Sequence, residues 1–184
     1  MRKNFGKKTW LYPMPVLIIA TYDKDGSVDV MNAAWGGIYD TNQIMICLDH
    51  SHKTTDNIKA SKAFTVNIAD SKNVDKCDFV GIVSLNDDVD KIKKSKFTFS
   101  KSTFVNAPIV NELKMCLECN LIKFNEDGIV VADIVNVSMD EEVLVNDKVD
   151  LNKLSPITFD PINLKYVALG ENAGNAFKDG LKLK

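Results

Sequence analysis

A chain of 184 residues has the length of one ordinary globular domain, so we expect a single domain over residues 1–184. Hydrophobic residues form 45% of the chain and charged residues 26%, which predicts a packed core and excludes general disorder. The formal net charge is -2 with lysines and acids interspersed, which excludes the broad basic face of a nucleic-acid-binding protein. The longest apolar run, residues 16–20, is too short to cross a membrane, and no secretory signal is recognisable, so we expect a cytoplasmic protein.

The first part of the chain predicts a meander of antiparallel strands. Residues 14–22 are rich in β-forming residues. The segment that follows them ends in Asp25-Gly26, a pair typical of tight turns. Residues 27–33 follow at once as the second strand. After a turn at residues 39–42, residues 43–49 form the third.

Helical patterns then interrupt the strands. Hydroxyl-bearing residues open a short polar helix over residues 51–61, with Ile58 facing inward, and residues 63–69 return to strand. Residues 70–96 are charged and have helical periodicity, which predicts two short helices.

The last part of the chain predicts a second hairpin, with strands over residues 115–124 and 129–139. A helical turn at 150–154, a closing strand at 164–169 and a loose tail at 170–180 follow. Strand-rich halves separated by helices favour an antiparallel barrel with peripheral helices over a doubly wound parallel sheet. The fold class is therefore mainly β.

The four cysteines predict ordinary reduced thiols and no metal site. Cys116 and Cys119 form a C-x-x-C, but they lie in a predicted strand, where residues three apart point to opposite faces. Cys47 and Cys77 lie in other elements, so no second pair completes a zinc site. No G-x-S-x-G elbow is present either, and we assign no catalytic residue.

The junction between the third strand and the polar helix is a candidate anion site, because free backbone N–H groups and the helix dipole meet there. Lys53 supplies a point charge, Ser51, Thr54 and Thr55 supply hydroxyl donors, and Asn57 can brace the loop. The alternative is that one of these hydroxyls only caps the helix.

The segment from Met31 to Gly37 is a candidate seat for a flat ligand, because small residues and a Gly pair let a ring approach the backbone. The alternative is that the glycines only form a turn and that Trp35 fills the core. No Rossmann or P-loop motif occurs, so a bound nucleotide is held in another way.

Several short segments, in order and spacing, resemble the flavin-reductase-like family of FMN-binding split barrels, and its flavoredoxin-type branch most nearly. They are Tyr12–Val16, Asp25-Gly26, Asn32–Gly36, His52–Ile58, Phe64–Asn67, Asp78–Ser84, Leu117–Cys119 and Tyr166–Gly170. The resemblance covers most of the chain.

This resemblance implies an antiparallel Greek-key split β-barrel that forms a homodimer, with flavin mononucleotide (FMN) in each of two grooves at the interface. The residues that match the isoalloxazine-lining segment are Met31, Asn32, Ala33, Ala34 and Trp35. Those that match the phosphate-binding loop are Asp49, Ser51, His52, Lys53, Thr54 and Thr55, and Asn67, Val83 and Ser84 match positions near the flavin. Family loops often carry Arg, whereas this loop has only Lys53, so a bidentate phosphate contact is lost.

The leading functional hypothesis is a reductase that takes electrons from NADH or NADPH and passes them through FMN to flavin or another acceptor. Electron transfer between protein partners, and a flavin-binding module without turnover, are the alternatives. The sequence contains no recognisable nicotinamide motif that would decide among them.

Overall fold

The computed structural model describes all residues, 1–184, and every strand pairing in it is antiparallel. The main sheet contains β2 (Leu17–Tyr22), β3 (Val28–Ala33), β4 (Gly36–Asp40), β5 (Gln43–Cys47), β6 (Ala63–Ile68), β9 (Met115–Phe124) and β10 (Ile129–Met139). A smaller sheet contains β1 (Met14–Pro15), β13 (Ile157–Asp160) and β14 (Lys165–Ala168), and the pairs β7 (Phe99–Lys101) with β8 (Pro108–Val110) and β11 (Leu144–Val145) with β12 (Lys148–Val149) are separate. The helices are α1 (Lys53–Ser61), α2 (Val74–Ile82), α3 (Lys91–Ser95) and α4 (Leu151–Leu154), with 3-10 turns η1 (Glu141–Val143) and η2 (Asp179–Leu183).

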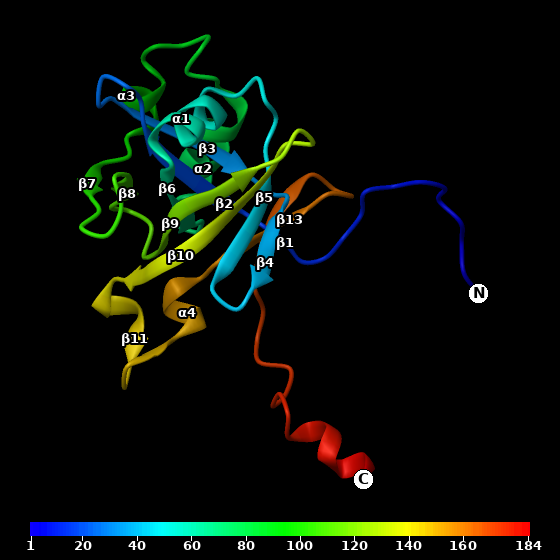
Figure 1. Ribbon diagram of the computed structural model, residues 1–184. Coiled ribbons are helices and arrows are strands. Elements are labelled where there is room, and N and C mark those ends of the chain that lie inside the picture. The colour runs from blue at the N-terminus through cyan, green and yellow to red at the C-terminus, as the bar shows by residue number, and fades with distance from the viewer.

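The main sheet has the strand order β3-β2-β6-β9-β10-β5-β4 and curls into a half-barrel (Figure 1). Strand β6 pairs with β2 and β9 and not with β5, the strand before it in the chain, which is a Greek-key connection. The predicted antiparallel split barrel is therefore confirmed.

The sheet has buried apolar residues on both faces, because alternate residues of a strand point in opposite directions. Leu17 and Ile19 of β2 face the inside of the curl, where they join a core cluster with residues of β3, β5, β6, β9, β10 and α1. Ile18 and Ala20 face outward and pack in a second cluster with residues of α2 and β8. Strand β3 thus lies between the interior core and helix α2.

Two predicted elements differ in the structure. The predicted strand 14–22 divides at Val16, because Met14–Pro15 pairs with β13 while Leu17–Tyr22 pairs with β3 and β6. The predicted turn at 39–42 is shorter, because residues 36–40 continue as strand β4 along β5. Gly36 is needed there, since a Cβ atom at this position would lie 2.9 Å from Leu17 Cδ1.

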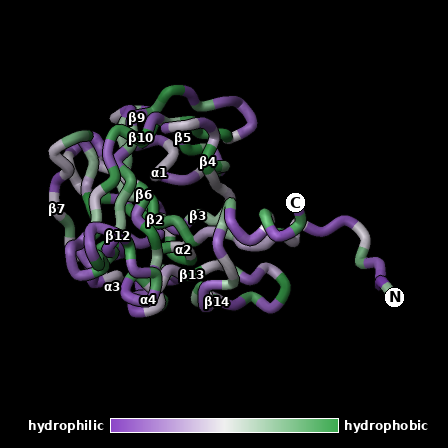
Figure 2. The backbone as a smooth tube through the Cα atoms, turned by 90° about the horizontal axis from the view of Figure 1, so that it is seen from below, coloured by the Kyte–Doolittle hydropathy of each residue, from purple (hydrophilic) through white to green (hydrophobic).

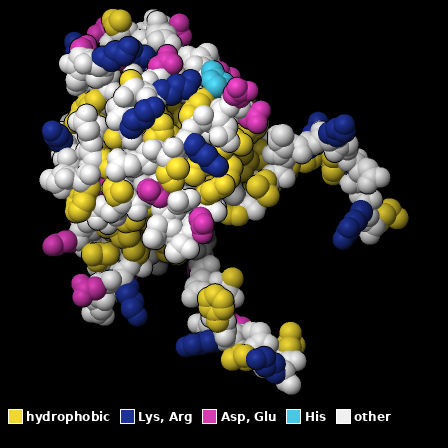
Figure 3. All heavy atoms as spheres, viewed as in Figure 1, with side chains coloured by type: hydrophobic (Ala, Val, Ile, Leu, Met, Phe, Trp, Pro, Cys, Tyr) yellow, Lys and Arg dark blue, Asp and Glu magenta, His cyan; other side chains and the backbone are white.

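Both chain ends project from the body: in Figure 1 the N-terminal arm leaves to the right and the C-terminal tail runs downward, and in Figure 2, seen from below, the arm again extends to the right. All residues of the first arm, 1–13, and of the C-terminal tail, 169–184, are exposed. The tail has no helix or strand before η2 begins at Asp179, as predicted, and Phe177 in it is 99% exposed. Figure 3 shows hydrophobic side chains on the face between the bases of the two arms. No helix is long and apolar enough to span a membrane.

Candidate functional site

Strand β3 and the residues that follow it, 34–37, pass three hollows in succession, and because neighbouring hollows share lining residues, we describe them as one groove. The first, which we call the polar hollow, has a volume of about 190 Å³. It brings together seven of the predicted cofactor-binding residues, namely Met31, Asn32, His52, Lys53, Thr54, Val83 and Ser84. They come from β3, the start of α1 and the end of α2, segments that are far apart in the sequence.

The start of helix α1 supplies hydrogen-bond donors to the polar hollow. The backbone N–H groups of Lys53 and Thr54 are in the first turn, where no intrahelical carbonyl is available. The side chains are already engaged: Lys53 Nζ lies 2.6 Å from Asp23 Oδ2, and the Thr54 hydroxyl donates to Asp29 Oδ2. The hydrogen bond from Lys53 also holds the pKa of Asp23 below its ordinary value.

Lys91 is a second cation in the polar hollow that the sequence analysis did not identify. Its side chain is 3% exposed, and its Nζ lies 3.8 Å from Asp29 Oδ1, which is too far for a hydrogen bond. Asp29 Oδ1 is buried and has no hydrogen-bond partner. Burial lowers the pKa of Lys91, and Asp29 opposes that shift. The Lys91 side chain is therefore almost fully buried, while its ammonium lines the hollow and makes no hydrogen bond within the protein.

The second hollow, which we call the middle hollow, has a volume of about 210 Å³ and shares Asn32, Gly81 and Ile82 with the polar hollow. Its other lining residues are Val16, Ala34, Asp78, Phe159 and Tyr166. Gly81 allows α2 to pack closely on β3, since a Cβ atom there would lie 3.0 Å from Asn32 Cβ.

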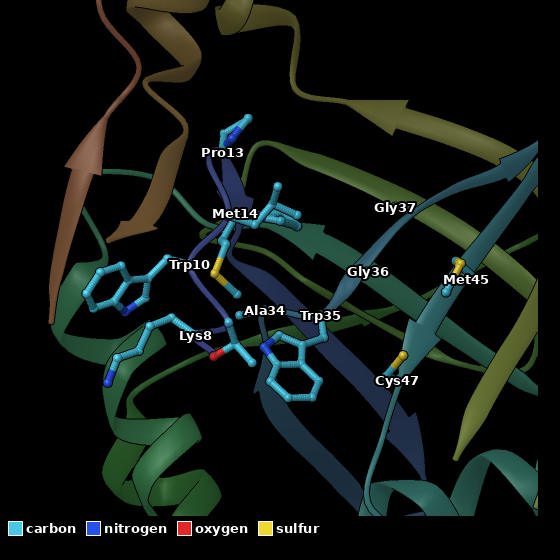
Figure 4. A pocket seen from close by; sticks show the side chains of 13 residues that line it. Lys8, Trp10, Pro13, Met14, Ala34, Trp35, Gly36, Gly37, Met45 and Cys47 are labelled. Carbon is cyan, nitrogen blue, oxygen red and sulfur yellow. The ribbon is translucent and has the colours of Figure 1, made fainter. Parts of the chain in front are cut away.

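The third hollow is an apolar cleft of about 530 Å³ that shares Ala34 with the middle hollow. Figure 4 shows Trp10 and Lys8 entering it from the first arm, Trp35 from the β3–β4 corner, and Met45 and Cys47 from β5. Trp35 is 57% exposed, so it does not fill the core. Gly37 has open space where a Cβ atom would be.

The dimensions suit an elongated ligand with one charged end. A strand advances about 3.3 Å per residue, so Met31 to Trp35 spans about 13 Å. The polar hollow lies at one end of this span and the apolar cleft at the other. The groove thus offers N–H and ammonium donors to an anion and an apolar strand edge to a ring.

The other predicted site residues lie outside these hollows. Asn57 and Asn67 are buried and donate to Thr21 Oγ1 and to the Ile18 carbonyl, respectively, and the Thr55 hydroxyl donates to the Asp49 carbonyl. Ala33 packs in the interior core cluster, and Ser51 donates to Asp49 Oδ1 on the surface. These residues support the groove from behind or from its rim, and direct contact between them and a cofactor stays a prediction.

The cysteines are all free. Burial raises the pKa of Cys77 and of Cys116 to about 12, and it also raises the pKa of Cys119. Buried thiols of this kind stay protonated and are poor nucleophiles near neutral pH.

A sequence-family model described as "Flavin reductase like domain" matches residues 9–158. The structure is similar to the flavoredoxin of Desulfovibrio vulgaris (Miyazaki F), with 34% identity, a TM-score of 0.93, and coverage of 98% of this chain and 100% of that one. It is also similar to the flavoredoxin of Methanosarcina acetivorans, with 27% identity, a TM-score of 0.89 and full coverage of both chains. Component B of nitrilotriacetate monooxygenase from Bacillus cereus shares the fold at 20% identity, with a TM-score of 0.78 over 90% of this chain and 89% of that one.

The half-barrel sheet and the groove along β3 define a split-barrel protein of the flavin-binding class. The chain belongs to the flavin reductase-like family, and the matching region, residues 9–158, includes the lining of all three hollows except Lys8, Phe159 and Tyr166.

Proposed function

We propose that the groove holds FMN, with the phosphate in the polar hollow and the isoalloxazine ring along Met31–Trp35. The observation that carries this proposal is the Lys91 ammonium, which makes no hydrogen bond, ends an almost fully buried side chain and lines the same hollow as the first turn of α1. Three donor groups that converge on one small hollow fit a phosphate. The relative described as an FMN-binding domain, from Shewanella baltica OS155, has the same fold at 20% identity and a TM-score of 0.79.

Asp29 sets a condition on phosphate binding. Its carboxylate shares the hollow and would repel a phosphate if it were not compensated. The adjacent Lys91 ammonium and the Thr54 hydroxyl both contact this carboxylate. The lining carries two carboxylates, Asp29 and Asp87, and two ammonium groups, Lys53 and Lys91, so a phosphate placed between Lys91 and the α1 N-terminus meets a hollow that is close to neutral. The affinity for phosphate therefore depends on Lys91 and on the backbone donors together.

We further propose that the protein takes electrons from NADH or NADPH and delivers them to flavin or another acceptor. A bound flavin supplies the hydride and electron chemistry. The residues of this chain orient the ring against β3, hold the phosphate and exclude water from the side that packs on α2. No side chain is needed as an acid or base for that role.

Electron transfer between protein partners is the second candidate, and the similarity to two flavoredoxins over the whole chain favours it. A flavin-binding module without turnover is the third. We also propose a homodimer, because Trp35, Ile38 and Tyr39 beside the apolar cleft are exposed, as are the apolar residues of both arms.

One experiment separates these functions. The protein is loaded with FMN and mixed under anaerobic conditions with NADH or NADPH while flavin absorbance is followed. A reductase loses its flavin absorbance within seconds. A carrier is not bleached by nicotinamide but is bleached by a reduced redox protein, and a storage module is bleached by neither. Failure of the apoprotein to bind FMN in calorimetry would refute all three.

A further inference from the structure

Three polar side chains, Asn32, Asp78 and Tyr166, line the middle hollow among apolar walls. Tyr166 donates its only hydroxyl hydrogen to Asp78 Oδ1 at 2.8 Å. Asp78 Oδ2 makes no hydrogen bond within the protein. Asn32 donates through Nδ2 to the Cys77 carbonyl at 3.1 Å, and its amide has a second N–H and an oxygen beside that bond. The middle hollow thus offers one free carboxylate oxygen next to an amide.

The hydrogen bond from Tyr166 decides which oxygen of Asp78 is available to a ligand. Burial and the Asp78 hydrogen bond raise the pKa of Tyr166 to about 12, so its hydroxyl stays protonated at neutral pH and continues to donate. Oδ1 therefore stays occupied, and Oδ2 is the oxygen that can accept from a ligand.

No cation contacts the Asp78 carboxylate. Lys72 and Lys165 line a separate open hollow that Asp78 and Tyr166 also line, but neither lysine forms an ion pair with Asp78. The negative charge of Asp78 is therefore not compensated within the chain, in contrast to Asp29 in the polar hollow, which lies 3.8 Å from the Lys91 ammonium.

The middle hollow lies between the two ends of the groove. It shares Asn32 with the polar hollow and Ala34 with the apolar cleft. A flat ring that is held along Met31–Trp35 therefore has one part in the middle hollow and another in the apolar cleft. The polar groups of the middle hollow face the first part, and only apolar walls face the second.

The two ends of an isoalloxazine ring differ in the same way. One end is a dimethylbenzene without polar atoms, and the other is a pyrimidine ring whose N3–H lies between two carbonyl oxygens. The dimethylbenzene end matches the apolar cleft, and the pyrimidine end matches the middle hollow. There Asp78 Oδ2 is an acceptor for the N3–H, and the second N–H of Asn32 is a donor for a neighbouring carbonyl.

We propose that Asp78 accepts the N3–H of the flavin ring in the middle hollow, which sets the direction of the ring in the groove and disfavours its reduced form. This inference rests on the proposed function, because it assigns residues to the flavin that the groove is proposed to hold. Tyr166 is a positioning residue that acts through Asp78. Reduction of a flavin by two electrons with uptake of one proton leaves a negative charge on its pyrimidine ring, and a carboxylate beside that ring opposes the charge.

The first test removes the hydrogen that Asp78 is proposed to accept. 3-Methyl-FMN carries a methyl group on N3 and keeps the phosphate and the ribityl chain of FMN. Fluorescence titration of the apoprotein measures the dissociation constants of both flavins. The wild type should bind FMN about tenfold more tightly than 3-methyl-FMN or better, because a charge-assisted hydrogen bond is lost with the methyl compound.

Two substitutions and one matched control locate this preference. Asp78→Asn should reduce it to about threefold or less, because Tyr166 still donates to the remaining oxygen and the new N–H then faces N3. Tyr166→Phe should reduce it about threefold, because Asp78 is no longer held in one orientation. Asp75→Asn is the control, since Asp75 is exposed on the same helix and does not line the middle hollow. It should keep the wild-type preference.

The second readout is the reduction potential of bound FMN, which needs neither a nicotinamide nor an acceptor protein. It is measured in an anaerobic titration against a redox dye of known potential. Asp78→Asn should increase the affinity for reduced FMN relative to oxidised FMN about tenfold, which raises the potential by about 30 mV for a two-electron couple. Asp75→Asn should change this ratio less than about threefold, because solvent screens an exposed charge.

The outcomes distinguish this inference from the proposed function. Equal affinity of the wild type for FMN and 3-methyl-FMN overturns the inference and leaves the FMN site standing. An Asp78→Asn variant with the wild-type preference and potential also overturns it, since Asp78 then only supports the hollow. If thermal unfolding shows that this variant is not folded, an unchanged preference in Tyr166→Phe overturns the inference instead. No binding of FMN to the apoprotein refutes the proposed function itself.

Discussion

The two ends of the groove are built in opposite ways. At the polar end, Lys53 and Thr54 already have partners within the chain, Asp23 and Asp29, and Lys91 is held 3.8 Å from Asp29 without a hydrogen bond. At the apolar end, Trp10 and Trp35 line a wide cleft and remain partly exposed. One wall of that cleft is an arm that otherwise leaves the body.

This difference shows where ligand binding is pre-organised and where it is not. The polar end has its geometry before a ligand arrives, so the affinity for an anion is the difference between new contacts and existing pairs. The apolar end gains its affinity by burying surface, and a ring there stays exposed until another surface covers it. Substitutions at the two ends should therefore have different signatures.

The largest effect is expected for Lys91. Lys91→Gln should weaken FMN about ten- to a hundredfold, because a charge-assisted hydrogen bond contributes about 1.5–3 kcal/mol. Riboflavin, which lacks the phosphate, should be affected less than about threefold. Fluorescence titration of the apoprotein with both flavins measures the two constants.

The control addresses the buried charge that this change leaves behind. Lys91→Gln alone leaves the Asp29 carboxylate buried without a cation, which is destabilising by itself. The double variant Asp29→Asn with Lys91→Gln removes both charges and should fold well while still binding FMN weakly. Equal weakening of both flavins in the double variant would show that Lys91 supports the fold and not the phosphate.

The next largest effect is expected for substitutions in the C-terminal tail, which test what covers the exposed apolar end of the groove. Changing Phe177, Leu181 and Leu183 to Ser should raise the dissociation constant of the dimer about thirtyfold or more. Full burial of such a side chain contributes about 1.5–3 kcal/mol, so about 2 kcal/mol in total is a cautious value. Sedimentation velocity over a concentration series measures the change.

A matched variant with Lys178, Lys182 and Lys184 changed to Ser alters the same tail but keeps its apolar residues. It should leave the dimer intact. If both variants dimerise like the wild type, the tail does not cover a second copy, and the apolar end must be completed by something else.

The third test distinguishes ring from phosphate. Trp35→Ala should weaken FMN and riboflavin by the same factor, about tenfold, because Trp35 contacts only what lies in the apolar cleft. Fluorescence titration with both flavins shows whether the factors match. An effect on FMN alone would contradict the assignment of the two ends.

The sequence predicts the sheet better than it predicts the groove. Runs of β-forming residues and Asp-Gly turns identified β2, β3, β9 and β10, because these signals are local. The sequence does not predict strand β4, because Gly36 and Gly37 have low strand propensity and are held in the strand by pairing with β5. Strand β13 was missed because its ladder is formed with the distant Met14–Pro15 and with β14.

The site, like the fold, was predictable only where its residues have a local sequence signature. The phosphate loop and the Met31–Trp35 strand have local signatures, and the structure places them on one groove. Lys91 has no such local signature, because it is one of several lysines in a charged helical segment and only the packing of α3 buries it. The pairing of Asp78 with Tyr166 joins residues 88 positions apart, which no local pattern indicates.

The smallest effect is expected at Lys53, the only cation in the predicted loop. Its ammonium is committed to Asp23, and both side chains are partly exposed, so Lys53→Ala should weaken FMN only about two- to threefold. Asp23→Asn is the informative partner, because it frees the ammonium and should strengthen FMN by a similar factor. Since the hydrogen bond from Lys53 lowers the pKa of Asp23, that carboxyl stays ionised in mild acid, whereas the FMN phosphate gains a proton between pH 7 and pH 5, so both effects should become smaller together at pH 5. Fluorescence titration at the two pH values measures them. A loss for Lys53→Ala as large as that for Lys91→Gln would show that the Asp23 pair opens when FMN binds, and the polar end would then not be pre-organised.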